Sequence, residues 1–346
     1  MPASKSQRVR AVMKKALKKK QGGANLYGIK QGAAMVNTRP FPRRARRNGR
    51  GSSDARLATM IKYGLNALHP CHLALPRAVG GYSVVRTTDI INSNAATMFF
   101  GTFKGPGNQF TETTWLSTIA IRGVAPDTAI NGTGNAFLYN SSALQAPSLS
   151  GTRMVPAAMT VQIMNGQSLQ NADGIAYIGK SKTVLDLMGD TRTWRTVFED
   201  LVSYSAPRLC SGGKLALRGV QVDAVPNNLS VLSDFVPRRI PTEGARTWDE
   251  DQAALDFEGF APIFVYNPDN IDLKFLVTIE WRMRFDPLNP AYAGHVTHTP
   301  AAESTWSKVL AHAESLGHGV MDIADVVADV GAAGLRARDA IAPLLA

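Results

Sequence analysis

Only two cysteines, Cys71 and Cys210, occur in the 346 residues of the sequence. Two cysteines form at most one bridge, so the chain is not a disulfide scaffold. It also lacks any uninterrupted apolar run of about 18 residues, the length that a helix needs to cross a bilayer. The N-terminus has cations but no apolar run behind them, unlike a secretory signal. The sequence therefore predicts a protein that stays inside the cell that makes it.

Acidic residues are almost absent from the first 56 positions. That segment holds sixteen Lys or Arg against one acid, Asp54, so its formal charge is +15. The remaining residues hold 22 basic and 26 acidic side chains, a formal charge of −4. Cations segregated in one terminal arm are typical of a tail that binds a polyanion. A solvated tail or a nuclear localisation signal is the alternative interpretation.

The arm divides into two parts. Residues 5–20 favour a basic helix formed on a polyanion, whereas residues 21–56 are rich in Gly, Asn, Pro and Arg, so we expect order there to come from a partner. The cations that we expect to contact phosphates are Lys5, Arg8, Arg10, Lys14, Lys15, Lys18, Lys19, Lys20, Arg39, Arg43, Arg44, Arg46, Arg47 and Arg50.

Eight runs between Tyr82 and Phe285 have the Val, Ile, Thr, Tyr and Phe content of strands. One convincing helix, Trp194–Val202, interrupts them, and a short helix is expected at Leu57–Leu68, ended by the His69-Pro70 pair. Strands without alternating helices favour an antiparallel sandwich or barrel. The sequence predicts an all-β, eight-stranded antiparallel jelly-roll sandwich, with strands at 82–91, 96–103, 115–121, 154–164, 174–179, 215–225, 261–266 and 273–285.

Several segments occur in an order that resembles a known family. The basic arm is followed by "PCH" at Pro70, "TTDIINSNAATMFFGTF" at Thr87, "RMVPAAMTVQIMNGQSLQNADGIAYIG" at Arg153 and "FLVTIEWRMRFDPLNP" at Phe275. This order resembles the shell domain of small icosahedral virus coat proteins, particularly the nodavirus-like and tombusvirus-like group. The resemblance implies a nucleic-acid-binding arm at 1–56, a jelly-roll shell domain at 57–300 and a C-terminal amphipathic helical segment at 301–346.

A coat protein of this kind is a structural protein and not an enzyme. The resemblance implies assembly inside the host cell, in the cytoplasm or the nucleus, into the icosahedral shell of a virion. With about 180 copies, the arms would supply about 2,700 positive charges, the order needed for an RNA or single-stranded DNA genome of a few thousand nucleotides. A cellular RNA-binding protein with a basic tail and an enzyme with a localisation tail are the alternatives. The body lacks the basic, aromatic surface of single-strand binders.

The C-terminal segment has apolar residues at helical spacing. Val320, Ile323, Val327 and Val330 recur at that spacing, with aspartates mostly opposite, so we expect a helix over Val320–Ala346. In nodavirus-like coats such a helix lies under the shell and is implicated in membrane disruption, which implies transient contact with a host membrane. Packing on the inner shell surface is the alternative, and the acidic polar face favours it.

The self-cleavage of the nodavirus family is not expected in this chain. The matching segment "PCHLALPRAVGGYS" contains no acid, and no Asn-Ala pair lies shortly before the C-terminal helix, since the late Asn289 is followed by Pro290. We therefore expect an intact chain that ends at Ala346.

An acidic loop, "TWDEDQAALDFEG", groups five carboxylates. Clustered carboxylates at subunit contacts of related shells bind calcium, so the resemblance implies an interface calcium site, with a solvated loop as the alternative. The candidate ligands are Asp249, Glu250, Asp251, Asp256 and Glu258.

Histidines form two further groups. His69, Cys71 and His72 lie too close in sequence to surround one tetrahedral zinc ion. His295 and His298 flank a turn-like segment and are interpreted as a surface pair without a role or as a pH-sensitive interface.

Overall fold

The described residues form mostly antiparallel sheets with few helices, so the prediction of an all-β protein is confirmed. The structure is a computed structural model. It describes residues 25–28, 33–37, 50–69, 73–101, 103–104, 118–132, 134–181, 185–187, 189–229, 231–238, 244–246, 259–315 and 319–323.

The first sheet is built around two long strand pairs. β16 (Leu273–Arg284) lies between β3 (Gly81–Ser93) and β8 (Arg153–Asn165) and is antiparallel to both along almost its whole length. The full order is β1-β2-β3-β16-β8-β12-β18, with β13 also paired to β8 and β17 to β3. The other bounds are β1 (Asn25–Gly28), β2 (Ala33–Asn37), β12 (Val220–Asp223), β13 (Val236–Pro237), β17 (Val296–Thr297) and β18 (Val320–Asp322).

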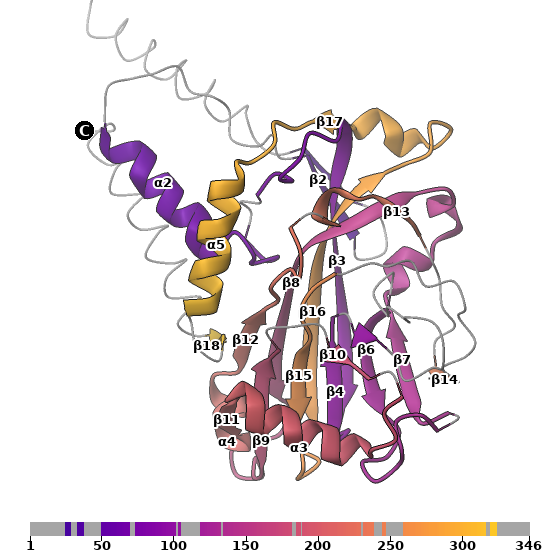
Figure 1. Ribbon diagram of the computed structural model, residues 1–346, viewed down its shortest axis with the longest axis vertical. Helices are drawn as coiled ribbons and strands as arrows, with labels where there is room; N and C mark the ends of the chain where they lie inside the picture. Colours follow the sequence, from indigo (N-terminus) through magenta and orange to yellow (C-terminus); the bar gives the residue numbers. More distant parts are fainter. Residues whose placement is uncertain are drawn as a thin grey trace, which may run out of the picture.

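The second sheet has the order β11-β9-β15-β4-β6-β7-β14 (Figure 1). Its strands are β4 (Thr97–Phe100), β6 (Thr118–Gly123), β7 (Ala136–Asn140), β9 (Ile175–Lys180), β11 (Arg208–Ser211), β14 (Gly244–Arg246) and β15 (Ile263–Tyr266). Two short strands, β5 (Phe103–Lys104) and β10 (Leu185–Asp186), pair in parallel outside the two main sheets. The chain therefore crosses between the sheets repeatedly, since β3, β8, β12 and β16 belong to the first and β4, β9, β11 and β15 to the second.

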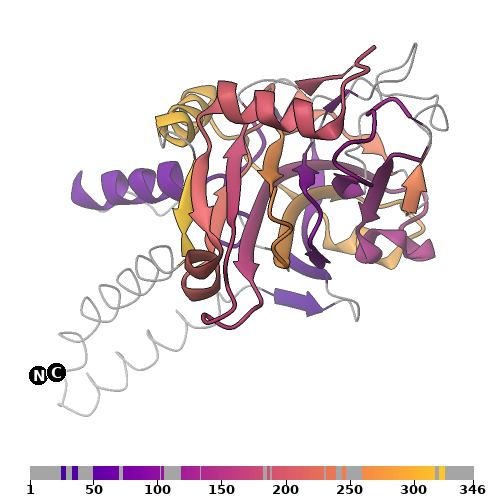
Figure 2. The ribbon, with the colours of Figure 1, turned by 90° about the horizontal axis from the view of Figure 1, so that it is seen from below.

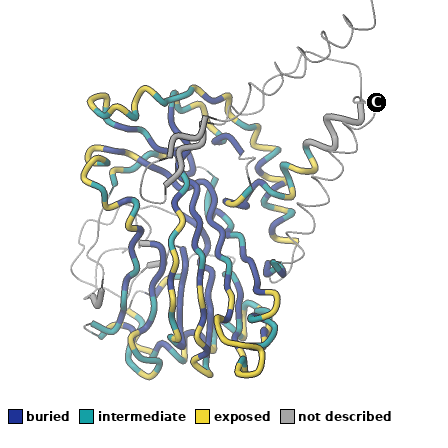
Figure 3. The backbone as a smooth tube through the Cα atoms, turned by 180° about the vertical axis from the view of Figure 1, so that it is seen from behind, coloured by how far each residue is buried: buried dark blue, intermediate teal, exposed yellow. Residues whose placement is uncertain are grey.

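Apolar side chains fill the space between the sheets. Alternate residues of β16, from Phe275 to Met283, are buried in one cluster with Met98 and Phe100 of β4 and with Ile263 and Val265 of β15. This is the period-two pattern that a strand with one core-facing side requires. In Figure 3 the buried residues accordingly follow the strands, and the exposed residues gather at the connections.

Helix α3 (Trp194–Ser205) covers the outer side of the second sheet. It begins at Thr193, whose side-chain oxygen accepts a hydrogen bond from the Thr196 backbone N–H, as an N-cap residue does. It crosses the strands in the view of Figure 2. The predicted helix at Trp194–Val202 is confirmed and extends three residues further.

Helices α2 (Arg50–Tyr63) and α5 (Glu303–Ser315) pack against each other and against the first sheet (Figure 1). The predicted helix at Leu57–Leu68 therefore exists, but it starts earlier and ends at Tyr63. The chain turns at Gly64 because α5 approaches there: a Cβ atom at Gly64 would lie 3.1 Å from the Val309 side chain and 2.7 Å from the Met60 carbonyl oxygen.

Three sequence-based expectations are wrong in detail. Residues 215–217 were expected in a strand but belong to α4 (Gly212–Leu217), which Ser211 caps through its side chain. The expected helix from Val320 is replaced at its first three residues by β18, because they pair with β12. Order in residues 21–56 does not depend wholly on a partner, since β2 pairs with β3 and α2 starts at Arg50.

Single-turn helices make several of the connections. They are η1 (Ser142–Gln145), η2 (Pro147–Leu149), η3 (Val231–Ser233) and η5 (Pro290–Gly294). Asn289 caps the last of these, because its side chain accepts a hydrogen bond from the Ala291 backbone N–H.

Candidate nucleic-acid interface and the cavity beside it

The expected phosphate contacts lie almost wholly outside the described residues. Arg50 is the first residue of α2, and no other predicted arm cation falls in a described segment. The five carboxylates of the acidic loop, Asp249 to Glu258, also lie outside the described residues. The structure therefore shows how the arm joins the body, and the assignment of arm cations to phosphates stays a prediction.

The arm joins the body through the α2–α5 pair. Apolar residues from both helices and from the segment after α2 form one cluster, which includes Leu65, Leu73, Trp306 and Val309. The indole N–H of Trp306, which is fully buried, donates a 3.0 Å hydrogen bond to the Ala74 carbonyl oxygen. The pair is thus attached to the irregular segment that leads into β3.

A buried ion cluster lies beneath this attachment. The two oxygens of Glu280 on β16 bind two cations: Oε2 accepts from Arg86 at 2.6 Å, and Oε1 accepts from Arg282 at 2.7 Å. Both arginines also donate to backbone carbonyls of the segment after α2, Arg86 to His69 and Arg282 to Leu73. Glu280 and Arg282 are each 1% exposed. This cluster therefore binds the sheet to the chain segment that carries the arm.

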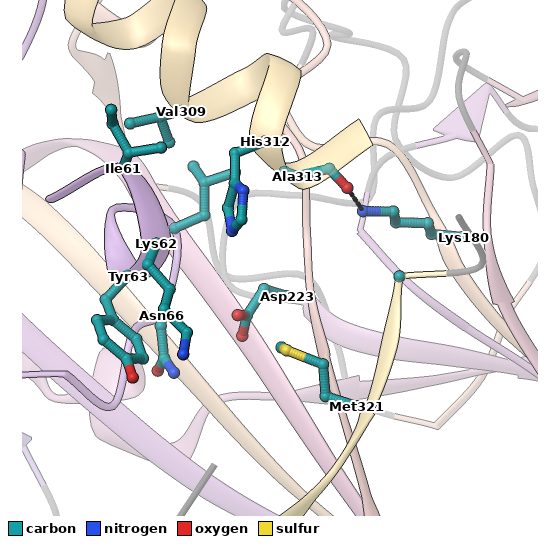
Figure 4. A pocket seen from close by; sticks show the side chains of 12 residues that line it. Ile61, Lys62, Tyr63, Asn66, Lys180, Asp223, Val309, His312, Ala313 and Met321 are labelled. Atoms are coloured by element: carbon teal, nitrogen blue, oxygen red, sulfur yellow. Dashed lines mark hydrogen bonds between the residues drawn. The ribbon is translucent and has the colours of Figure 1, made fainter. Parts of the chain in front are cut away.

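A cavity of about 120 Å³ lies where α2, α5, β12 and β18 meet (Figure 4). Its polar and charged lining comes from four different elements: Lys62 from α2, Lys180 from the end of β9, Asp223 from β12 and His312 from α5. The Lys180 ammonium donates a 2.9 Å hydrogen bond to the Ala313 carbonyl oxygen in the last turn of α5. The cavity therefore separates the helix pair from the outer side of the first sheet.

Asp223 is the carboxyl group of this cavity. Its Oδ1 accepts a 2.7 Å hydrogen bond from the Thr160 hydroxyl and a 3.2 Å bond from the Gln221 amide. Burial raises the pKa of Asp223 to about 6, although the two hydrogen bonds and the charge of Lys180 lower it. Thr160 also accepts a hydrogen bond from the Ala67 backbone N–H, so the same side chains touch the segment after α2.

The strand β18 forms the edge of the first sheet beside β12. Asp322 of β18 binds Arg208 at 2.9 Å and Lys214 at 3.4 Å, and Arg208 also donates to the Val320 carbonyl oxygen. These contacts join β18 to β11 and α4 of the facing layer. Residues 324–346, which hold most of the expected amphipathic helix, lie outside the described part of the chain.

The two late histidines are packed, so the surface-pair interpretation is wrong. His298 is 7% exposed and stacks on Tyr82 with 4.1 Å between ring centroids. Burial, together with the charge of Arg282, lowers the pKa of His298 to about 4. His295 accepts a hydrogen bond from the Phe285 backbone N–H, and burial lowers its pKa also. Both rings are therefore neutral near pH 7.

Comparison with known proteins assigns no family, since neither a family model nor a curated protein matches the chain. Within the described segments, no three His, Cys, Asp or Glu side chains are grouped so that they could hold a metal ion. None of the helices in those segments is long and apolar enough to span a bilayer.

The ion cluster and the cavity were missed by the sequence analysis. A signal existed for Glu280, because a lone acid inside the long apolar run "LKFLVTIEWRMRF" requires a buried partner. No comparable signal existed for Asp223. Its neighbours Thr160 and Lys62 are 63 and 161 positions away in the sequence, and only the sheet and the helix pair bring them together.

Proposed function

We propose that the chain is a viral capsid protein that assembles into an icosahedral shell and packages the genome through its basic N-terminal arm. The observation that carries the proposal is the joining of a +15 arm to a body of charge −4 that is built from two packed antiparallel sheets. Such a body can contact copies of itself without strong repulsion, while the arm neutralises phosphates.

The order of the strands supports a jelly-roll for the body. Four strands of the first sheet, in the order β3-β16-β8-β12, face four of the second, in the order β11-β9-β15-β4. Taken along the chain, these eight strands change sheet at every step except from β9 to β11, as two Greek keys require. The remaining strands are additions at the edges or between β4 and β8.

The positions of α2 and β18 support a single inward-facing side. α2, which includes the end of the arm, and β18, which precedes residues 324–346, both belong to the layer formed by the first sheet and its helix pair (Figure 1). In a shell, this arrangement brings both terminal segments to the same side as the packaged nucleic acid. Membrane contact by residues 324–346 and calcium at residues 249–258 remain proposals that follow from the resemblance alone.

Electron microscopy of the purified protein, together with its 260 to 280 nm absorbance ratio, tests the proposal. We expect particles of tens of nanometres that contain nucleic acid. Deletion of residues 1–49 should leave a folded body and remove most of the nucleic acid, because α2 is retained and the cations are lost. A control chain that keeps the arm but has its fourteen predicted contact cations replaced by Gln should behave like the deletion.

Two results would contradict the proposal. Truncated particles with a full nucleic-acid load would show that the arm does not package the genome. A small species that binds RNA and never forms particles would favour the alternative, a cellular RNA-binding protein with a basic tail.

A further inference from the structure

The carboxyl group of Asp223 points into the cavity under the α2–α5 pair (Figure 4). Both of its protein hydrogen bonds, from Thr160 and Gln221, go to the same oxygen, Oδ1. Its other oxygen, Oδ2, faces the cavity. The carboxyl group must therefore either be solvated there by water or be protonated. In the closed arrangement that solvation depends on the small space left by the two helices.

The charged and titratable groups around Asp223 come from three elements. α2 contributes Lys62 and Tyr63, α5 contributes His312, and the end of β9 contributes Lys180, while β18 contributes the uncharged Met321. Lys180 is engaged with the Ala313 carbonyl oxygen. The charge of Lys180 and the two hydrogen bonds favour the ionised form of Asp223, but burial outweighs them, so the neutral form is favoured in the closed cavity relative to water.

We propose that the cavity is a proton-sensitive latch, in which protonation of Asp223 holds the α2–α5 pair on the first sheet and ionisation of Asp223 releases it. Release opens the cavity, and water then solvates the carboxylate. Because α2 follows the basic arm and α5 precedes β18, the latch sets how freely both terminal segments move. The latch acts within one subunit, so it does not require that the chain assemble.

The direction of the pH dependence follows from linkage. The pKa of Asp223 is about 6 in the closed arrangement and ordinarily 3.8 in water, so the closed arrangement binds more protons between these two values. The stability of the closed arrangement is therefore greatest at low pH and falls as the pH rises through 6. These two pKa values correspond to an increase of about tenfold in the opening of the pair between pH 5 and pH 7.5.

Hydrogen–deuterium exchange of the full-length chain tests the latch. After correction for intrinsic exchange rates, the protection of α2 and α5 amides should fall about tenfold from pH 5 to pH 7.5, measured relative to α3 amides in the same sample. α3 lies on the other sheet, so this ratio removes any change in the stability of the whole fold. In Asp223→Asn the ratio should not change with pH, because the amide does not titrate.

Two further variants test whether the pH dependence comes from Asp223 or from another acid or base. Asp89→Asn is the matched control, since Asp89 of β3 is also a half-buried acid with a raised pKa. Its carboxylate accepts a hydrogen bond from Ser141, the residue before η1, and does not line the cavity. His312→Gln replaces the imidazole that α5 contributes to the same cavity. Both variants should keep the wild-type fall in protection.

Three outcomes would overturn the latch: a wild-type ratio that stays level or rises with pH, an Asp223→Asn chain that keeps the fall, or a His312→Gln chain that loses it. If Asp223→Asn unfolds, proteolytic cleavage of the wild-type chain after Lys62 at pH 5, 6 and 7.5 gives a second measurement, scaled to a standard substrate. Cleavage should rise with pH if the latch exists and stay level if it does not.

Discussion

Helices cover the outer sides of both sheets, but the two contacts differ in chemistry. α3 meets the second sheet through aromatic and aliphatic side chains, among which Phe198 lies 4.4 Å from Phe99 between ring centroids. The α2–α5 pair packs through an apolar cluster on the segments that follow α2 and β12, and the Glu280 cluster and Asp223 lie close to these segments. The α3 contact includes Tyr266, whose hydroxyl donates a 3.1 Å hydrogen bond to Glu199 of α3, but its packing is mainly apolar, whereas the α2–α5 contact is bordered by buried ionisable groups.

Because of this difference, we expect the α2–α5 contact to depend on pH and the α3 contact not to. Burial of apolar area changes little between pH 5 and pH 8, so α3 should be a permanent part of the body. Buried carboxyl groups change their charge or lose their partners, so the α2–α5 contact can be loosened by the loss of a proton or by one substitution. The segment that carries the basic arm is attached by the second kind of contact.

The largest effect is expected from Glu280→Ala. Removal of this carboxylate leaves Arg86 and Arg282 buried without their common anion, at a cost of about 3–5 kcal/mol in the free energy of unfolding. Urea unfolding of the unassembled subunit measures the change. Asp127→Ala, which removes the partner of Arg195 in an exposed ion pair, is the control and should leave the urea midpoint unchanged. Equal midpoints for the two variants would show that the buried cluster does not hold the sheet to the segment after α2.

Phe198→Ala tests the apolar contact and should cost about 3–4 kcal/mol. Phe198 is fully buried and packs against Phe99, Phe264 and Tyr266. The loss should be the same at pH 5 and pH 8, because every group that it affects is uncharged in this range. A loss that differs by more than about 1 kcal/mol between the two pH values would contradict the distinction drawn between the two sheets.

The helix α3 and the long strands could be predicted from the spacing of apolar residues in the sequence. α3 could be predicted because its apolar residues recur at helical spacing, and the long strands β3, β8 and β16 because their composition and alternation are strong. Short strands such as β11 and β18 could not be, since only pairing with distant strands makes Val320–Asp322 extended in spite of its helical spacing. The cavity was beyond prediction for the same reason, because Asp223, Lys180 and His312 meet only in the folded chain.

His298 should make the stability of the fold depend on pH in the direction opposite to Asp223. Its pKa is about 4 in the folded chain and ordinarily 6.5, so the unfolded chain binds more protons between these values. Its contribution is fully present above pH 6.5 and is lost as the pH falls toward 4, by about 2 kcal/mol between pH 8 and pH 5. Urea unfolding at the two pH values measures the dependence, and His298→Gln should lose about 2 kcal/mol less than the wild type does between pH 8 and pH 5, because Asp223 contributes equally in both chains. A His298→Gln chain with the full wild-type loss would assign the acid sensitivity to another group.

The smallest loss of stability is expected from removal of the N-cap side chains of α3 and α4. Thr193→Ala removes the acceptor for the Thr196 N–H at the start of α3, and Ser211→Ala removes the acceptor for the Lys214 N–H at the start of α4. Each cap should contribute about 1 kcal/mol to its own helix. We expect the loss at Thr193 to appear in global unfolding, because α3 is packed on the apolar cluster of the second sheet. The loss at Ser211 should appear mainly as faster exchange of α4 amides, because α4 is only six residues long and Leu217 at its end is 65% exposed. A Thr193→Ala chain that unfolds at the wild-type urea concentration, with faster exchange confined to α3, would show instead that this helix opens independently and is not a permanent part of the body.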